Sequence, residues 1–234
     1  MATYLILGSN SFSGAYFTNY LLKKRKKVIA LSRSNFKKKV LNLNYDLKDK
    51  FVFRKFDLNN SKNSLNKIFK NFDDELIIIN FAAQGMVAES WNNPEDWYET
   101  NILGQVKFIK KIMSMNLNLK KFIHFSTPEV YGSTNKHITE SHAFSPSTPY
   151  AISRTCFDNH LMALYREFDF PTIITRTANV YGPTQDLYRI IPKTIMCILK
   201  KEKLNLEGKG NSKRSFIFSE DFCNAILIDR KSVV

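Results

Sequence analysis

Short apolar segments alternate with segments of helical periodicity along almost the whole chain, and this alternation restricts the possible folds more than any other feature. The runs "TYLILG" (3–8), "KVIALS" (27–32), "ELIIINFAA" (75–83) and "KKFIHFST" (120–127) are typical of buried strands. Segments with apolar residues at helical spacing, such as 94–115, separate them. Strands that alternate with helices favour right-handed crossovers and a parallel sheet. We therefore predict an α/β protein with a doubly wound parallel sheet.

The composition is that of a globular protein with a basic surface. Of the 234 residues, 44% are hydrophobic. No apolar stretch approaches the roughly 20 residues needed to cross a bilayer, so we expect a cytoplasmic protein without a membrane partner. The net charge is +14, but the basic runs are scattered and lack interleaved aromatic residues, so nucleic-acid binding is not expected. The three cysteines lack the spacing of metal ligands, and we predict no metal site.

The segment "GSNSFSG" (8–14) follows the first predicted strand and opens a predicted helix. Gly8 permits a tight turn, and Gly14 permits close packing of the helix on the strand. The start of the helix offers free N–H groups to a pyrophosphate. The alternative is a purely structural turn. Because the pattern lies between a strand and a helix, we predict that it binds a dinucleotide.

Polar side chains follow the next two strands, at the sheet edge where ligands of parallel sheets bind. Arg33 lies between Ser32 and Ser34, where an NAD-binding protein would carry an acidic residue. A cation beside hydroxyls suits a 2′-phosphate, which favours NADP over NAD, although a surface cation is the alternative. Asp57 follows the third predicted strand. It either accepts a hydrogen bond from an adenine amino group or caps the next helix.

The later strand ends carry small residues, hydroxyls and a carboxylate. Ala82 and Ala83 would let the main chain approach a cofactor, or they pack in the core. Thr127 and Glu129 lie at the tip of the fifth strand, where a glutamate is either a base or a loop cap. We predict that 171–183 form the sixth strand with its exit loop, which would present the Asn179 amide to a phosphate or sugar.

The helical segment "SPSTPYAISRTCFDNHL" contains Tyr150 and Arg154, four residues apart. This spacing is one helical turn, so both side chains can reach the same point in space. A neighbouring cation favours the phenolate, the form of tyrosine that acts as a base. Taken alone, such a pair is more often an ordinary surface neighbour than a catalytic couple.

Eight motifs occur in order: "GSNSFSG", "FDL", "NFAAQ", "TNILG", "STPEVYG", "YAISR", "TRTANVYGP" and "RSFIFSED". Together they resemble the extended short-chain dehydrogenase/reductase family, and within it the dTDP-glucose and GDP-mannose 4,6-dehydratases and the related epimerases. The resemblance implies a Rossmann fold that binds NADP or NAD over residues 1–178. Residues 179–234 would form an incomplete substrate-binding lobe intertwined with it. It also implies a nucleotide-diphosphate sugar as substrate and a homodimer formed through a four-helix bundle.

The resemblance further implies roles for single residues in a 4,6-dehydratase reaction. Tyr150 would remove the proton from the sugar 4-hydroxyl, Thr127 would orient that hydroxyl, and Glu129 would take the C5 proton. Arg154 occupies the position of the family's lysine. The other implied cofactor contacts are Gly8, Ser11, Phe12, Gly14, Arg33, Asp57, Leu58, Ala82 and Ala83. The implied substrate contacts are Asn179, Arg189 and Arg214.

Two departures from the family pattern keep alternatives open. Pro128 stands where the dTDP-glucose dehydratases have an aspartate, and proline cannot donate a proton to the leaving 6-hydroxyl. Arg154 keeps the charge of lysine but is longer and planar. A nucleotide-sugar 4-epimerase, which needs Thr127 and Tyr150 but not Glu129, is therefore the first alternative. A non-catalytic dinucleotide-binding module is the second.

Overall fold

The computed structural model describes residues 2–36, 49–60, 64–134, 138–140, 143–206 and 213–228. The described residues up to Arg176 form one compact unit, and those from Thr177 form a second. Within these ranges no helix has both the length and the apolar character that crossing a membrane requires. Cofactor binding by residues 1–178 and substrate binding by residues 179–234 stay predictions.

Helices separate most of the successive strands that the structure describes in the first unit. Its strands are β1 (Ala2–Leu7), β2 (Lys27–Ser32), β3 (Phe51–Lys55), β4 (Glu75–Asn80), β5 (Leu119–Phe125) and β6 (Thr172–Thr175). Its α-helices are α1 (Phe12–Lys23), α2 (Ser64–Ile68), α3 (Pro94–Tyr98), α4 (Gln105–Met113) and α5 (Pro149–Phe168). Two 3-10 turns, η1 (Ala88–Trp91) and η3 (Pro128–Tyr131), and a π-helical segment, η2 (Glu99–Gly104), complete it.

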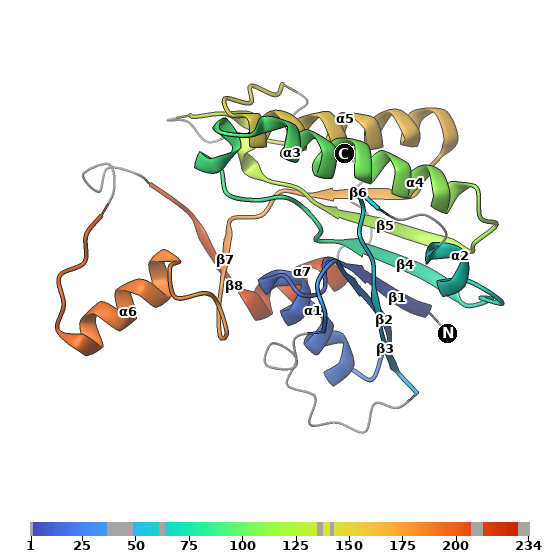
Figure 1. Cartoon of the computed structure of the whole chain (residues 1–234), viewed down its shortest axis with the longest axis horizontal. Coiled ribbons are helices and arrows are strands. Elements are labelled where there is room, and N and C mark those ends of the chain that lie inside the picture. The colour runs from blue at the N-terminus through green and yellow to red at the C-terminus, as the bar shows by residue number, and fades with distance from the viewer. Residues whose placement is uncertain are drawn as a thin grey trace. The chain divides into compact units, whose positions relative to one another are not determined.

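The six strands form one sheet in the order β3-β2-β1-β4-β5-β6, and all pairs are parallel. The prediction of a doubly wound parallel sheet is confirmed. Figure 1 shows α3, α4 and α5 on one face of this sheet and α1 on the other. The strand order reverses between β1 and β4, and in such sheets ligands bind at this switch point, beyond the carboxyl ends of the strands.

The core follows from the two-residue period of the strands. Leu5 and Leu7 of β1 are buried in one cluster with Phe108 of α4 and Phe157 of α5. Ile6 lies between them and is fully buried on the opposite face, toward α1. Both faces of the sheet are thus covered, which explains why the strands read as continuous apolar runs.

Two elements differ from the prediction. Residues 171–183 do not form one strand with an exit loop, because β6 ends at Thr175 and a separate strand, β7 (Asn179–Tyr181), follows. The side chain of Arg176 pairs with Asp158 of α5, and the chain leaves the sheet at this point. The segment 94–115 is divided into α3, η2 and α4, so a π-helical stretch interrupts the predicted helix.

The second unit contains a two-stranded parallel sheet and two helices. β7 pairs with β8 (Phe216–Phe218), and Tyr181 packs on Phe218 with ring centroids 5.6 Å apart. The helices are α6 (Ile190–Lys200) and α7 (Ser219–Ile228).

Candidate functional site

The glycine turn brings the carboxyl ends of three neighbouring strands together. The main-chain N–H groups of Gly8 and Ser9 both donate to the carbonyl oxygen of Leu31 at 2.9 Å, which joins the ends of β1 and β2. Gly8 has φ +82°, and a Cβ there would lie 2.7 Å from the main-chain nitrogen of Ala82, after β4. Only glycine satisfies both the backbone conformation and this close approach.

The turn leads directly into the N-terminus of α1. Ser11 is the N-cap residue, and its Oγ accepts a hydrogen bond from the Gly14 N–H at 3.1 Å. A Cβ on Gly14 would collide with the carbonyl oxygen of Gly8. Phe12 is the first residue of the helix. Both predicted glycine roles, the tight turn and the close packing of helix on strand, are therefore observed.

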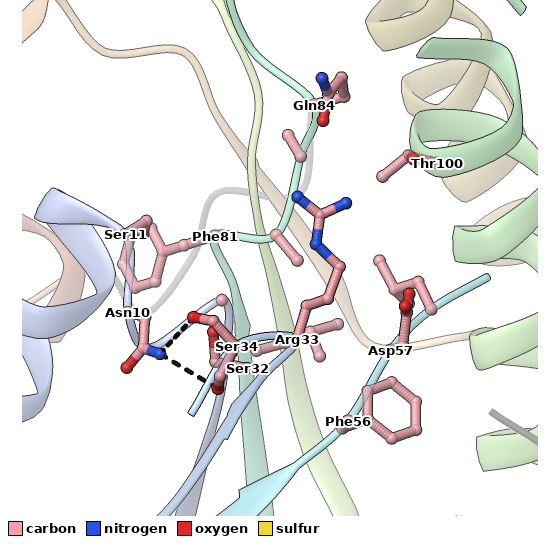
Figure 2. Close-up of a pocket in the computed structure, with 15 residues that line it drawn as sticks. Asn10, Ser11, Ser32, Arg33, Ser34, Phe56, Asp57, Phe81, Gln84 and Thr100 are labelled. Atoms are coloured by element: carbon pink, nitrogen blue, oxygen red, sulfur yellow. Dashed lines mark hydrogen bonds between the residues drawn. The ribbon is translucent and has the colours of Figure 1, made fainter. Parts of the chain in front are cut away.

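A cavity of about 380 Å³ opens beside this turn (Figure 2). Its walls come from the carboxyl ends of β1 to β4 and from η2. Seven predicted cofactor contacts line it, namely Gly8, Ser11, Arg33, Asp57, Leu58, Ala82 and Ala83. The predicted contacts Phe12, Gly14, Tyr150 and Arg154 are not among the lining residues. Both alanines thus line the cavity, and Ala82 also packs against the core.

Arg33 extends from the end of β2 across this cavity toward Gln84, as Figure 2 shows. The segment that carries it is fastened by Asn10, whose Nδ2 donates to Ser34 Oγ at 2.8 Å and to the Asn35 carbonyl at 2.8 Å. Asp57 also lines the cavity, and its Oδ1 accepts a hydrogen bond from the Asn59 N–H at 3.1 Å. Asp57 therefore caps a turn.

Three polar lining residues, Asn10, Gln84 and Thr100, were not predicted, and neither were the apolar lining residues Leu7, Phe56 and Phe81. The main chain of Gln84 is held by Asn101, whose Oδ1 accepts from the Gln84 N–H at 2.7 Å and whose Nδ2 donates to the Gln84 carbonyl at 3.0 Å. Thr100 and Asn101 lie in the π-helical segment, a feature often found at functional sites. The motif "TNILG" that contains them was the available signal.

The tip of β5 carries two of the predicted catalytic side chains. Thr127 is almost fully buried and caps η3, with its Oγ1 accepting from the Glu129 N–H at 3.3 Å. Glu129 is half-buried. The cap fixes Thr127 and Glu129 relative to each other at the carboxyl end of the strand.

The predicted catalytic tyrosine is the second residue of α5, and hydrogen bonds hold the first turn of this helix in place. Thr148 caps it by accepting from the Ala151 N–H at 3.1 Å. The Tyr150 N–H donates to Ser90 Oγ, after β4, at 3.2 Å. Asn101 Nδ2 donates to Ser153 Oγ at 2.9 Å. The same asparagine therefore contacts the cavity wall at Gln84 and the start of the tyrosine helix.

Arg154, one turn after Tyr150, is directed at β5 and is 2% exposed. Its Nη2 donates to the Phe125 carbonyl and lies 3.1 Å from His124 Nε2. Among the described residues, Nε and Nη1 of Arg154 have no hydrogen-bond partner. The guanidinium is therefore held against the strand with two donor groups unused.

A second buried guanidinium lies next to it. Asp158 Oδ2 accepts from Arg176 Nε at 3.1 Å, from Arg176 Nη2 at 2.9 Å and from Ser126 Oγ at 2.9 Å. Burial raises the pKa of the Asp158 carboxyl, and the guanidinium groups of Arg176 and Arg154 oppose this shift. Arg176 Nη1 also donates to the Tyr131 hydroxyl at 3.1 Å. The ion pair joins α5 to the end of β6, and its hydrogen bonds with Ser126 and Tyr131 link both to the β5 tip that carries Thr127 and Glu129.

The three predicted substrate contacts belong to the second unit. Asn179 is exposed and donates from Nδ2 to the Ser215 carbonyl at 3.3 Å. Arg189 lies over the Tyr188 ring, 5.1 Å from its centroid, and Arg214 is exposed. Their predicted role stays a prediction.

Residues 4–231 match the NAD dependent epimerase/dehydratase family. The chain belongs to this family. The family name implies NAD as cofactor, and the residues of the site fit it. Gly8 leaves space at the turn that a Cβ would occupy, and hydroxyl groups and the cation of Arg33 line the cavity beside the turn. This membership confirms the resemblance seen in the sequence.

Several relatives in the family have described activities. The dTDP-D-glucose 4,6-dehydratase of Dictyostelium discoideum is 33% identical over 246 aligned positions, which cover 98% of this chain and 56% of the relative. A trifunctional enzyme of Arabidopsis thaliana, one of whose activities is UDP-glucose 4,6-dehydratase, is 30% identical. The alignment covers 97% of this chain and 36% of that enzyme. The chain thus spans little more than half the length of the first relative and about a third of the second.

Solved structures of the family have the same fold. A dTDP-glucose 4,6-dehydratase from Streptomyces venezuelae with NAD bound superposes with a TM-score of 0.84 at 27% identity, covering 97% of this chain and 70% of that chain. A UDP-glucose 4-epimerase from Thermotoga maritima with UDP-glucose superposes with a TM-score of 0.82 at 26% identity, covering 97% and 72%.

Proposed function

We propose that this chain carries the cofactor site and the acid-base residues of a nucleotide-sugar 4,6-dehydratase that uses NAD or NADP. The main support is the docking of α5. Its first turn is bonded to Ser90 and Asn101, and Ser126 Oγ lies 2.9 Å from Asp158 farther along the helix. Tyr150 and Arg154 are thereby tied to the strand ends that also carry Thr127 and Glu129. The dehydratase relatives point to the same reaction class.

In this mechanism three side chains act on the sugar. Tyr150, as phenolate, removes the proton of the 4-hydroxyl, and Thr127 hydrogen-bonds the same oxygen and orients it. When bound, NAD or NADP would supply the redox chemistry, as the acceptor of the C4 hydride and its donor to C6. The 4-ketone acidifies the C5–H, and Glu129 removes that proton while water leaves from C6. In this proposal the positive charge of Arg154, one helical turn after Tyr150, compensates the negative charge on the tyrosine oxygen.

The leaving 6-hydroxyl needs a proton, and Pro128 cannot give one. Glu129 is the nearest carboxyl in the sequence, and its main chain is fixed by Thr127. In the proposed reaction Glu129 therefore passes the proton taken from C5 to the leaving hydroxyl. The proton that C5 regains comes from solvent, so the overall change is the loss of one water.

A 4-epimerase is the second candidate, and Pro128 is the residue that favours it. An epimerase also removes the 4-hydroxyl proton and a hydride from C4, but it needs no acid at position 128. The similarity to the Thermotoga maritima UDP-glucose 4-epimerase agrees with this alternative. Mass spectrometry of products from dTDP-, UDP-, GDP- and CDP-sugars separates the two candidates, since only a dehydratase product is lighter by one water.

We also propose that NADP is preferred over NAD, because Arg33 reaches into the cavity beside Ser32 and Ser34 (Figure 2). A charged hydrogen bond to the 2′-phosphate contributes about 1.5 to 3 kcal/mol. Arg33→Ala should therefore weaken NADP binding about tenfold or more and change NAD binding little. Titration calorimetry with both cofactors measures this.

The matched control for Arg33 is Arg54→Ala in β3. Arg54 is exposed and does not line the cavity. Arg54→Ala should leave the affinities for NAD and NADP unchanged. Equal losses of NAD and NADP affinity in the Arg33 variant would rule out recognition of a 2′-phosphate.

The quaternary structure we propose is a homodimer through α5 and the helices before it. Up to Ala163, the exposed residues of α5 are apolar or small, namely Ile152, Cys156, Asn159 and Ala163. Leu103 of η2 is 54% exposed as well. Sedimentation equilibrium should give twice the monomer mass of 27.2 kDa, and a monomer at all concentrations would refute the dimer.

A further inference from the structure

A buried line of polar side chains connects the wall of the cofactor cavity with Arg154. It starts at Ala82, which lines the cavity, and passes through Asn80 and Gln105 to His124. From His124 it reaches Asp158 and Arg154 on α5. Asn80, Gln105, His124 and Asp158 are fully buried. Most polar groups buried in such a site form hydrogen bonds with their neighbours.

The two amides of this line have fixed orientations because each contacts the main chain. The Ala82 N–H, which can only donate, gives its hydrogen to Asn80 Oδ1 at 3.1 Å. The Ala82 carbonyl, which can only accept, receives Gln105 Nε2 at 2.7 Å. Asn80 Nδ2 then donates to Gln105 Oε1 at 2.9 Å, which agrees with both assignments.

This orientation determines the tautomer of His124. Asn80 Nδ2 lies 3.1 Å from His124 Nδ1 and can only donate, so Nδ1 is the acceptor. Burial, followed by the charges of Arg154 and Arg176, lowers the pKa of His124 well below its ordinary value. The ring is therefore neutral, and its single hydrogen is on Nε2.

The hydrogen on Nε2 has one possible acceptor among the described neighbours. Arg154 Nη2 lies 3.1 Å away but is itself a donor, so these two groups cannot form a hydrogen bond. Asp158 Oδ1 lies 3.7 Å away and is buried without another partner among the described residues. A small movement of the ring toward Asp158 would bring these two groups within hydrogen-bond distance.

We propose that His124 is a positioning residue: as the Nε2-protonated tautomer it donates to Asp158 and keeps that carboxylate from pairing with Arg154. This role rests on the proposed function, in which the Arg154 charge serves Tyr150. Asp158 then satisfies Arg176, Ser126 and His124. Arg154 keeps the Phe125 carbonyl as its only acceptor among the described residues, and in the proposed mechanism its charge remains available to Tyr150.

The charges of the cluster explain why it matters which groups pair with the Asp158 carboxylate. Two guanidinium groups share one carboxylate, and the charged and titratable groups around His124 are Arg154 and Asp158 of α5 and Arg176 after β6. With His124 neutral, one positive charge is left over in a buried site. If Asp158 paired with Arg154 instead, the charge of Arg154 would be compensated and the surplus charge would lie on Arg176, so Arg154 would stabilise a phenolate less.

The direct test is nitrogen-15 NMR of the histidines in the full chain with NAD bound. The chain has four histidines, and His124→Leu identifies the resonances of this one. Long-range proton–nitrogen correlations should show His124 protonated at Nε2 only, and unchanged across neutral pH. Protonation at Nδ1, or titration in this range, would overturn the proposal whether or not an activity has been found.

The functional test compares His124→Leu with Phe157→Leu. Phe157 is fully buried and packs edge-on against the His124 ring at 4.8 Å, so its variant removes packing but no hydrogen bond. Turnover of folded His124→Leu should fall about tenfold, part of the roughly 10² to 10⁴-fold effect of acid-base catalysis, at unchanged KM. Phe157→Leu should keep wild-type turnover per folded molecule.

Equal turnover of the two variants would contradict the role of His124. A wild-type chain that converts no nucleotide sugar would instead refute the proposed function and leave the tautomer to be judged by NMR. If His124→Leu does not fold, the NMR spectrum of the wild-type chain still decides, with His160→Gln and the two remaining histidines used for assignment by exclusion.

Discussion

Replacing Tyr150 with phenylalanine should lower turnover of the nucleotide sugar by about 10² to 10⁴-fold, the usual contribution of a general acid or base. The phenol oxygen is the only group removed. Because the docking of α5 involves the Tyr150 main chain and not its hydroxyl, the helix should remain in position. Affinity for NAD or NADP should therefore change little, and the loss should appear in kcat rather than in cofactor binding.

Tyr165→Phe is the matched control for this prediction. Tyr165 lies on the same helix, and its carbonyl accepts the hydrogen bond of the C-cap residue Asp169. Removing its hydroxyl leaves that main-chain bond intact. Wild-type turnover is expected for this variant. Substantial turnover in Tyr150→Phe would mean that another group removes the 4-hydroxyl proton.

Glu129→Gln should abolish dehydration while leaving the first half of the reaction intact. Glutamine has nearly the same shape but cannot take the C5 proton, so the loss should again be about 10² to 10⁴-fold. Oxidation at C4 does not require Glu129. A single-turnover experiment should therefore show reduced cofactor by its ultraviolet absorbance, without release of water from the sugar.

The Glu129 variant also separates the two candidate functions. An epimerase does not use this carboxylate, so full activity of Glu129→Gln would identify the chain as an epimerase. Glu167→Gln, a change at an exposed position near the end of α5, supplies the control. It should have no effect on either half of the reaction.

The sequence predicted the sheet and the glycine turn well because both depend on local patterns. Apolar runs fix the buried strands, and Gly8 and Gly14 stand between a strand and a helix. The carboxyl ends of parallel strands meet at one edge, so Arg33, Asp57 and Ala82 could be predicted to come together. The same logic does not apply to Gln84, whose place at the cavity is fixed by Asn101 from a distant helix.

The environment of Arg154 could not be predicted from its spacing to Tyr150. Spacing predicts that two side chains share a helix face, but it does not reveal which buried groups meet that face. His124, Asp158 and Arg176 come from three different elements, and the hydrogen bonds among them depend on tertiary packing. The end of β6 also depends on tertiary packing, because the strand stops at Thr175 and the next residue, Arg176, pairs with Asp158.

The central claim is the loss of water from a nucleotide sugar with return of the C4 hydrogen to C6. The most direct measurement is the product mass after incubation of the chain with NADP or NAD and a nucleotide sugar in deuterium oxide. We predict a product lighter by one water that carries one solvent deuterium, at C5. A sugar of unchanged mass with altered configuration at C4, or no conversion of any nucleotide sugar, would contradict it.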